Sequence, residues 1–371
     1  MVSQKDRLVF LDLMRAFAVL MMVQGHTVDS LLSDSYRTFD SIFYSGWNLM
    51  RGFTAPIFMF TSGVVFTYLL RLRKEPFMQN PRVGKGIRRF LLLVGLGYTL
   101  RYPSYRIVDF SIVESQQWKV FFALDALQLI GFGIFFILLL SYIGEKLKIA
   151  DKYIFPAGAL FFFCLMPFMY SINWIEYLPL PFAGYFYTGS GSLFPLFPWA
   201  GYVLAGAFFG SLLARNPGSY QSNAFPVKLL LAGIGFIGLS VAIDFLINKM
   251  SNLNDYWENG FSLIFLRIGF VLILNGIMSV ISFKFSNIPD IFKKIGTNTL
   301  LIYVIHLIIL YGSAWSPGLF QLYGKNLVPE HVILFAAAMI VLMVFMVVLV
   351  ERYKSNSKLQ KMAAANSFTE A

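Results

Sequence analysis

Three ionisable side chains, Asp12, Arg15 and His26, lie within one strongly apolar stretch, residues 7–30. Charged groups inside a membrane-spanning helix are costly, so they usually face a bundle interior or a wet cavity and mark function. Asp12 and Arg15 are three residues apart and are therefore neighbours on one helix face. His26 follows Arg15 by eleven residues, which places it within about 20° around the helix and about 16 Å further along. One helix face should thus carry all three.

His26 is the candidate for chemistry on this face. The unperturbed pKa of an imidazole lies near neutrality, so a neutral histidine can take a proton from an attacking hydroxyl or amine. The alternative is a histidine that only reaches the membrane interface from a helix end. Asp29, one turn later, either orients the ring or is a solvated acid. Asp12 and Arg15 are either a structural pair, or Arg15 contacts phosphate groups, which suit a guanidinium.

Later segments add further candidates. His306 and Tyr303 are three residues apart and share a helix face, which favours a second polar position inside the bundle. Ser62 and Gly63 form a small-residue step that is typical of close helix packing. The same step would also allow a ligand to approach the backbone.

A polar pocket is expected toward the outer ends of the spans. Asp244 and Arg267 could pair with each other there, and aromatic or charged side chains could flank them, namely Trp47, Arg51 and Trp199. Aromatic rings with mixed charges suit a sugar or a headgroup, although tryptophan is also common at membrane interfaces. The sequence shows no histidine pair at ligand spacing and no acidic cluster, so no metal site is predicted.

The composition indicates an integral membrane protein. Of the 371 residues, 57% are hydrophobic and 13% are charged, whereas soluble proteins carry roughly a quarter charged residues. The net charge of +11 follows from basic cytosolic loops, so we predict contact with membrane lipids and no nucleic-acid partner. The first apolar run lacks a cleavage site of small residues and should remain as the first helix.

An all-α bundle of about ten transmembrane helices is predicted, with both termini cytoplasmic because the basic clusters then fall on one side. The expected spans are 8–29, 53–71, 87–102, 119–143, 152–170, 193–214, 227–248, 261–283, 297–314 and 331–351. Residues 1–351 should form a single domain. The polar tail 352–371 is expected to be disordered.

The motif around Arg15 and His26 resembles the first helix of the membrane acyltransferase-3 family. Two further segments resemble that family: APIFMFTSGVVFT (55–67) and LIYVIHLIIL (301–310). The segment FPLFPWAGYVLAGAFFG (194–210) is similar to the related heparan-alpha-glucosaminide N-acetyltransferase group, in which Pro-Trp-x-Gly-Tyr recurs. In that second group the position of His26 is usually Asn, and the reactive histidine precedes a Trp-Asn step. Here Trp47-Asn48 is present, but Tyr44 occupies the corresponding position.

The resemblance implies a multi-pass acyltransferase of the inner cell membrane. It would move an acyl group, most simply acetyl from cytosolic acetyl-CoA, to a hydroxyl or amino group of a cell-surface glycan or lipid-linked sugar, with His26 as the base. The basic segment ending in Arg88 and Arg89 is then a candidate dock for the phosphates of CoA, since it is expected to run into a helix N-terminus. Anionic lipid is its other candidate ligand. The rival hypothesis is a secondary transporter in which the buried ionisable groups relay protons.

Overall fold

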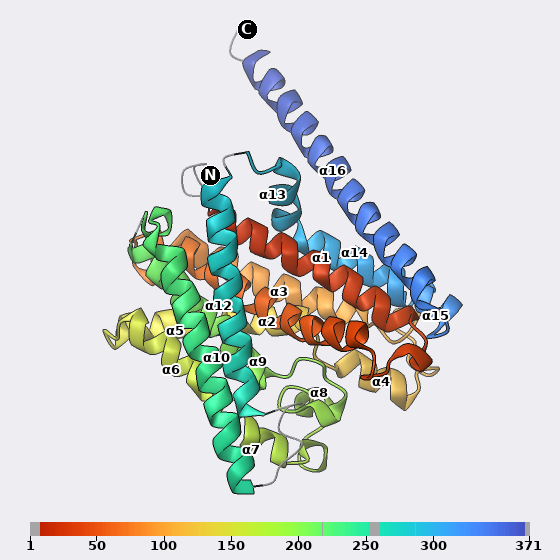
Figure 1. The fold of residues 1–371 in the computed structure, drawn as a ribbon. Coiled ribbons are helices and arrows are strands. Elements are labelled where there is room, and N and C mark those ends of the chain that lie inside the picture. The colour runs from red at the N-terminus through yellow and green to blue at the C-terminus, as the bar shows by residue number, and fades with distance from the viewer. Residues whose placement is uncertain (1–7, 217, 252–259, 286, 368–371) are drawn as a thin grey trace. The chain divides into compact units, whose positions relative to one another are not determined.

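A computed structural model of the chain describes residues 8–216, 218–251, 260–285 and 287–367, and these form helices and connecting loops without a strand (Figure 1). The α-helices are α1 (Val9–Leu31), α2 (Ile42–Arg71), α3 (Pro81–Leu100), α4 (Ser115–Phe122), α5 (Ala126–Lys146), α6 (Asp151–Cys164), α7 (Met166–Ser171), α8 (Leu180–Ala183), α9 (Leu196–Arg215), α10 (Ala224–Ser251), α12 (Phe261–Lys284), α13 (Asp290–Thr297), α14 (Thr299–Tyr311), α15 (Leu319–Tyr323) and α16 (Pro329–Ser367). Short 3-10 helices occupy Asp34–Tyr36, Phe77–Gln79, Trp174–Glu176, Thr188–Ser190 and Ser219–Gln221. The all-helical fold class predicted from the sequence is confirmed.

The chain divides into two compact units, whereas one domain was expected over residues 1–351. Unit 1 comprises Met1–Arg51, Phe285–Gly312 and Pro317–Ala371, and unit 2 comprises Gly52–Lys284 and Ser313–Ser316. Unit 1 therefore joins the first helix of the chain to its last helices. This grouping depends on contacts between distant segments, which apolar periodicity along the sequence does not reveal.

Unit 1 is built around α1, which packs against α13, α14 and α16 (Figure 1). Its core is formed by small and branched side chains from these four helices: Ala16, Val19, Val23, Ile295, Ile302, Leu310, Met339, Met343 and Val347. Between α13 and α14 the chain bends by 72° at one residue, Asn298. Together the two helices are long and apolar enough for a broken span or a re-entrant loop. The start of α14 contacts α1 through Thr299 and Arg15.

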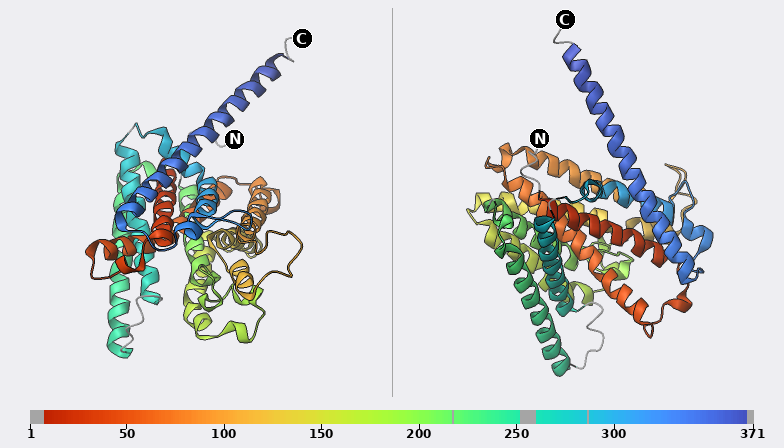
Figure 2. Two further views of the ribbon diagram at one scale, coloured as in Figure 1. Left: turned by 90° about the vertical axis from the view of Figure 1, so that its right-hand side faces the viewer. Right: turned by 45° about the horizontal axis from the view of Figure 1, so that its top comes forward.

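Unit 2 contains four main helix pairings. Helices α10 and α12 run side by side in both views of Figure 2, α3 packs on α5, and α6 and α5 each pack on α9. The N-terminus of α5 is fixed by Asp125, whose side chain accepts from the backbone of Ala126, while Gln128 returns a contact to the cap. Helices α2 and α9 approach closely because a Cβ at Gly63 would overlap with the carbonyl of Val203.

Eight of the described helices are long and apolar enough to cross a membrane, and nine spans result if α13 and α14 count as one. The sequence had predicted about ten. The expected span 87–102 lies in α3, whose first nine residues hold four cations, Arg82, Lys85, Arg88 and Arg89. The apolar remainder of α3 is eleven residues, or about 16 Å, which is shorter than a bilayer core.

The end of the chain also differs from expectation. Helix α16 continues to Ser367, whereas disorder was expected from residue 352. Its last segment is rich in Lys, Gln, Leu, Met and Ala, which are strong helix formers.

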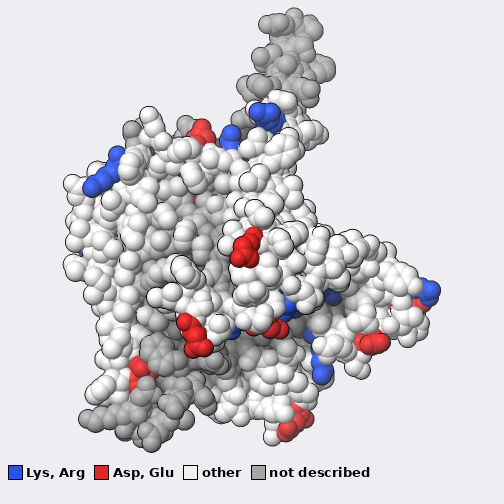
Figure 3. All heavy atoms as spheres, turned by 45° about the vertical axis from the view of Figure 1, so that its right-hand side comes forward, with Lys and Arg blue, Asp and Glu red and all other residues white. Residues whose placement is uncertain are grey.

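On the face shown in Figure 3, few of the described atoms belong to charged side chains, in keeping with a lipid-facing surface.

Candidate functional site

Helices α1 and α14 run alongside each other in unit 1 and make side-chain contacts at two levels. At one level, Arg15 Nη2 donates to Thr299 Oγ1 over 3.1 Å. At the other, His26 meets Tyr311. Eleven residues separate the two positions on α1 and twelve separate them on α14, so the helices run in the same direction. The expectation that Arg15 and His26 share one face of the first helix agrees with this arrangement.

The ring of His26 lies between two aromatic side chains of α14. Tyr311 Oη is 3.3 Å from His26 Nδ1, and their ring centroids are 5.9 Å apart with the planes at 80°. The ring of His306 stands edge-on to His26, with centroids 5.4 Å apart and planes at 86°. His26 is half-buried, while His306 is fully buried. The structure thus brings two of the chain's three histidines into contact, one of them accessible and one beneath it.

The backbone fixes the tautomer of the buried histidine. His306 Nδ1 is 2.8 Å from the carbonyl oxygen of Ile302, and a carbonyl can only accept, so Nδ1 carries the proton. In neutral His306 the lone pair is then on Nε2. Tyr303 packs on the same ring, with centroids 5.6 Å apart, and is 1% exposed. The pair Tyr303 and His306 predicted from its spacing therefore does share a face, and this face is turned toward α1.

The first residues of α2 lie against the same half of α1. Trp47 Nε1 donates to Gln24 Oε1 over 2.9 Å, and Arg51 forms a 2.7 Å ion pair with Asp29. The guanidinium of Arg51 also lies 5.7 Å from the centre of the Trp47 ring. These contacts hold α2 close to the turn of α1 that carries His26. Asp29 does not stand free in solvent, since Arg51 and Arg37 both pair with it.

Two candidate residues, Asp12 and Tyr44, lie at contacts between packed segments of unit 1. The backbone carbonyl of Asp12 lies against Gly296 of α13, and the side chain is 7% exposed. Tyr44, which stands where related enzymes place a reactive histidine, packs with Leu31, Leu32 and Val332 in an apolar cluster. Nothing in that cluster would activate a nucleophile.

The candidates for donor binding lie in unit 2. Arg88 and Arg89 are exposed on α3, but the expectation that they precede a helix N-terminus is wrong. Helix α3 begins at Pro81, and Asn80 caps it by accepting from the backbone N–H of Arg82. Ser62 donates to the carbonyl of Phe58 over 2.8 Å. Its neighbour Gly63 lies at the contact between α2 and α9, which agrees with the alternative that this small-residue step serves helix packing.

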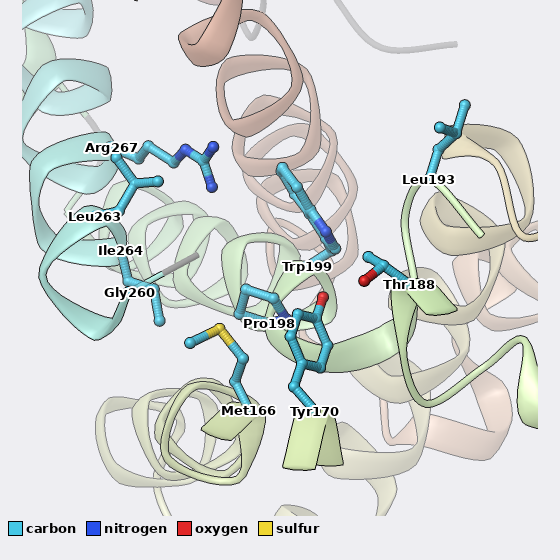
Figure 4. A pocket seen from close by; sticks show the side chains of 10 residues that line it. All are labelled: Met166, Tyr170, Thr188, Leu193, Pro198, Trp199, Gly260, Leu263, Ile264 and Arg267. Atoms are coloured by element: carbon cyan, nitrogen blue, oxygen red, sulfur yellow. The ribbon is translucent and has the colours of Figure 1, made fainter. Parts of the chain in front are cut away.

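Trp199 and Arg267 meet at a cavity in unit 2 (Figure 4). The guanidinium of Arg267, on α12, lies 5.1 Å from the centre of the Trp199 ring. A pair between Asp244 and Arg267 was one alternative that the sequence left open. Within the described part of the chain no ion pair joins them, and Asp244 Oδ1 is buried without a hydrogen bond.

Tyr311 and Gln24 were not singled out from the sequence. Tyr311 ends α14 in an apolar run, where tyrosine usually marks the interface, and its spacing of five from His306 does not place the two residues on one helix face. Within the residues described here, no group of three or more His, Cys, Asp or Glu side chains could hold a metal ion. The site is therefore made of imidazole, phenol, amide and guanidinium groups.

Comparison with protein families gives one match. The model of the catalytic region of heparan-alpha-glucosaminide N-acetyltransferase matches residues 7–250, about two thirds of the chain. The matched part includes Arg15, His26 and Trp199 but ends before Arg267, His306 and Tyr311. No curated protein matches the chain. The chain is thus a multi-pass membrane protein that belongs to the heparan-alpha-glucosaminide N-acetyltransferase catalytic family.

Proposed function

We propose that this protein transfers an acetyl group from acetyl-CoA to an amino or hydroxyl group of a glycan or lipid-linked sugar, with His26 as the general base. The observation that carries the proposal is the contact of His26 with Tyr311 and His306 on α14. A half-buried imidazole that is held by a phenol and backed by a second imidazole is suited to receive and return one proton. Family membership favours acyl transfer over the rival hypothesis of a transporter.

The reaction balances with His26 as the only proton carrier. His26 takes the proton as the acceptor's nitrogen or oxygen attacks the thioester carbonyl, and a tetrahedral intermediate forms. The carbon–sulfur bond then breaks, and the departing thiolate receives the proton from the imidazolium. The products are the acetylated acceptor and CoA, and His26 returns to its neutral form.

Two contacts of His26 support this role. Tyr311 restricts the rotation of the ring through the contact at Nδ1, which leaves Nε2 to face the acceptor. The ring of His306 packs edge-on against His26 and limits the positions that the imidazole can adopt. His306 is thus a positioning residue for the base.

The donor is proposed to bind through cations. Arg15, about 16 Å along α1 from His26, is one candidate for its phosphates, and exposed Arg88 and Arg89 of α3 are the others. The inner cell membrane, with the donor on the cytosolic side, is the proposed location. The cations in the first half of α3 favour the cytosolic side for that segment.

The proposal is tested by CoA release from purified full-length protein with acetyl-CoA and glucosamine as the acceptor probe. His26→Ala should abolish release, while the matched control His331→Ala, which changes the exposed histidine of α16, should retain it. Binding of acetyl-CoA is measured separately and should persist in both variants. Equal release by wild type and His26→Ala would overturn the assignment of the base and would direct attention to His306.

A further inference from the structure

The cavity in unit 2 has a mainly apolar lining into which four polar side chains project. It lies between α7, the start of α9 and the first turns of α12, with a volume of about 100 Å³. Arg267 reaches into it from α12, and the indole of Trp199 and the hydroxyls of Thr188 and Tyr170 are turned toward the same space (Figure 4). The indole N–H and the guanidinium can donate hydrogen bonds but cannot accept them.

The acceptors needed to satisfy these donors are scarce. Tyr170 donates its proton to the carbonyl of Phe197 over 2.9 Å, so its oxygen is the acceptor that remains free to face the cavity. Arg267 Nε is buried and has no hydrogen bond to the part of the chain that the structure describes. No carboxylate belongs to the described lining, and Arg267 makes no ion pair with a described acid. A buried N–H group without a hydrogen-bond acceptor is costly.

The charge and size of the cavity select the kind of ligand. Its volume is several times the roughly 10–15 Å³ that one water requires, which leaves room for a small polyatomic group. Gly260 and two residues of the first turn of α12, Leu263 and Ile264, contribute to the wall. The positive end of the helix dipole adds to the attraction for an anion.

We propose that this cavity binds a small oxyanion, the carboxylate or phosphate group of a ligand, through the guanidinium of Arg267 and the indole N–H of Trp199. A guanidinium matches the geometry of both groups. One face of the Trp199 ring is already covered by Arg267, so the indole contributes its N–H and not a stacking surface for a sugar. This site is independent of the proposed acetyl transfer, because neither His26 nor any other residue of unit 1 takes part.

The test is anion binding to the purified full-length chain in detergent at constant ionic strength. The probes are inorganic phosphate and glucuronate, with glucose as the neutral counterpart, and the readouts are the midpoint of thermal unfolding and the dissociation constant. Both anions should raise the unfolding midpoint of the wild type, since a ligand that binds the folded state stabilises it, and glucose should not. A larger effect of phosphate or of glucuronate identifies which of the two groups the site prefers.

Variants separate the site from the rest of the surface. Arg267→Gln should weaken anion binding by about 10-fold to 100-fold, the range for a hydrogen bond to a charged group. Arg267→Lys keeps the charge and should recover part of that loss. Trp199→Phe keeps the ring and should weaken binding by about 2-fold to 10-fold, as for one neutral donor. Arg106→Gln, an exposed arginine elsewhere in unit 2, is the matched control and should bind as the wild type does.

Three outcomes would overturn the proposal. The first is an equal effect of glucose and glucuronate, and the second is unchanged anion affinity in folded Arg267→Gln and Trp199→Phe. The third concerns the acids of residues 252–259, Asp255 and Glu258. If replacing both with their amides tightens anion binding 10-fold or more, the chain's own carboxylate is the occupant. Because acetyl transfer is not the readout, loss of activity in His26→Ala would leave all of these outcomes unaffected.

Discussion

Replacing Tyr311 with phenylalanine isolates the contribution of one hydroxyl to the action of His26. Phenylalanine keeps the ring that stands at 80° to the imidazole and removes the oxygen that lies 3.3 Å from Nδ1. A neutral hydrogen bond contributes about 0.5–1.5 kcal/mol net, which corresponds to about 2-fold to 12-fold in rate at about 1.4 kcal/mol per decade. The distance is at the long end for a hydrogen bond, so we expect a 2-fold to 5-fold loss of kcat.

The assay is steady-state CoA release by Tyr311→Phe, with the unfolding midpoint measured in parallel. Tyr311 is 38% exposed, so the stability of the protein should hardly change while kcat falls. KM for acetyl-CoA should stay constant, because an orienting contact acts on the chemical step. An unchanged kcat would show that the hydroxyl does not orient the base. A loss above about 100-fold would refute the reasoning in the other direction, because it exceeds what one neutral hydrogen bond supplies.

Two further predictions concern unit 2. If the exposed side chains of Arg88 and Arg89 bind the phosphates of the donor, replacing both with Gln should raise KM for acetyl-CoA by about 10-fold with little effect on kcat. KM is measured by CoA release, and an unchanged value would assign the two arginines to lipid instead. Gly63→Ala should destabilise the protein by about 1–3 kcal/mol, because the added Cβ overlaps with a backbone carbonyl of α9. Gly95→Ala is the control: its Cβ meets open space, so the substitution should be neutral or stabilising. Thermal unfolding in one detergent compares the two, and equal shifts would contradict the packing argument.

The arrangement of the proposed site was partly accessible from the sequence. Helical periodicity placed Arg15 and His26 on one face and Tyr303 with His306 on another, and both faces do meet between α1 and α14. Periodicity describes one helix at a time, however, and it could not show that these two faces touch. The contact with Tyr311 arises only from that pairing.

Errors in the sequence interpretation have local physical causes. The helix that carries Arg88 and Arg89 was started too late, although Asn80 followed by Pro81 is a typical cap and first residue. Asp244 and Arg267, which could have paired, form no ion pair in the described part of the chain, and the guanidinium lies over the Trp199 ring. The sequence supplied the residue types in these cases, and the choice among partners depended on packing.

Chemical rescue of His26→Ala by imidazole tests the central claim most directly. The variant removes the proposed base and leaves space beside Tyr311, so free imidazole added at increasing concentration can take its place. The account predicts that CoA release by His26→Ala is restored in proportion to imidazole, while His331→Ala and the wild type do not respond. Two results would contradict a proton-accepting role for His26. One is a variant that still binds acetyl-CoA but releases no CoA at any imidazole concentration. The other is a variant that is fully active without imidazole.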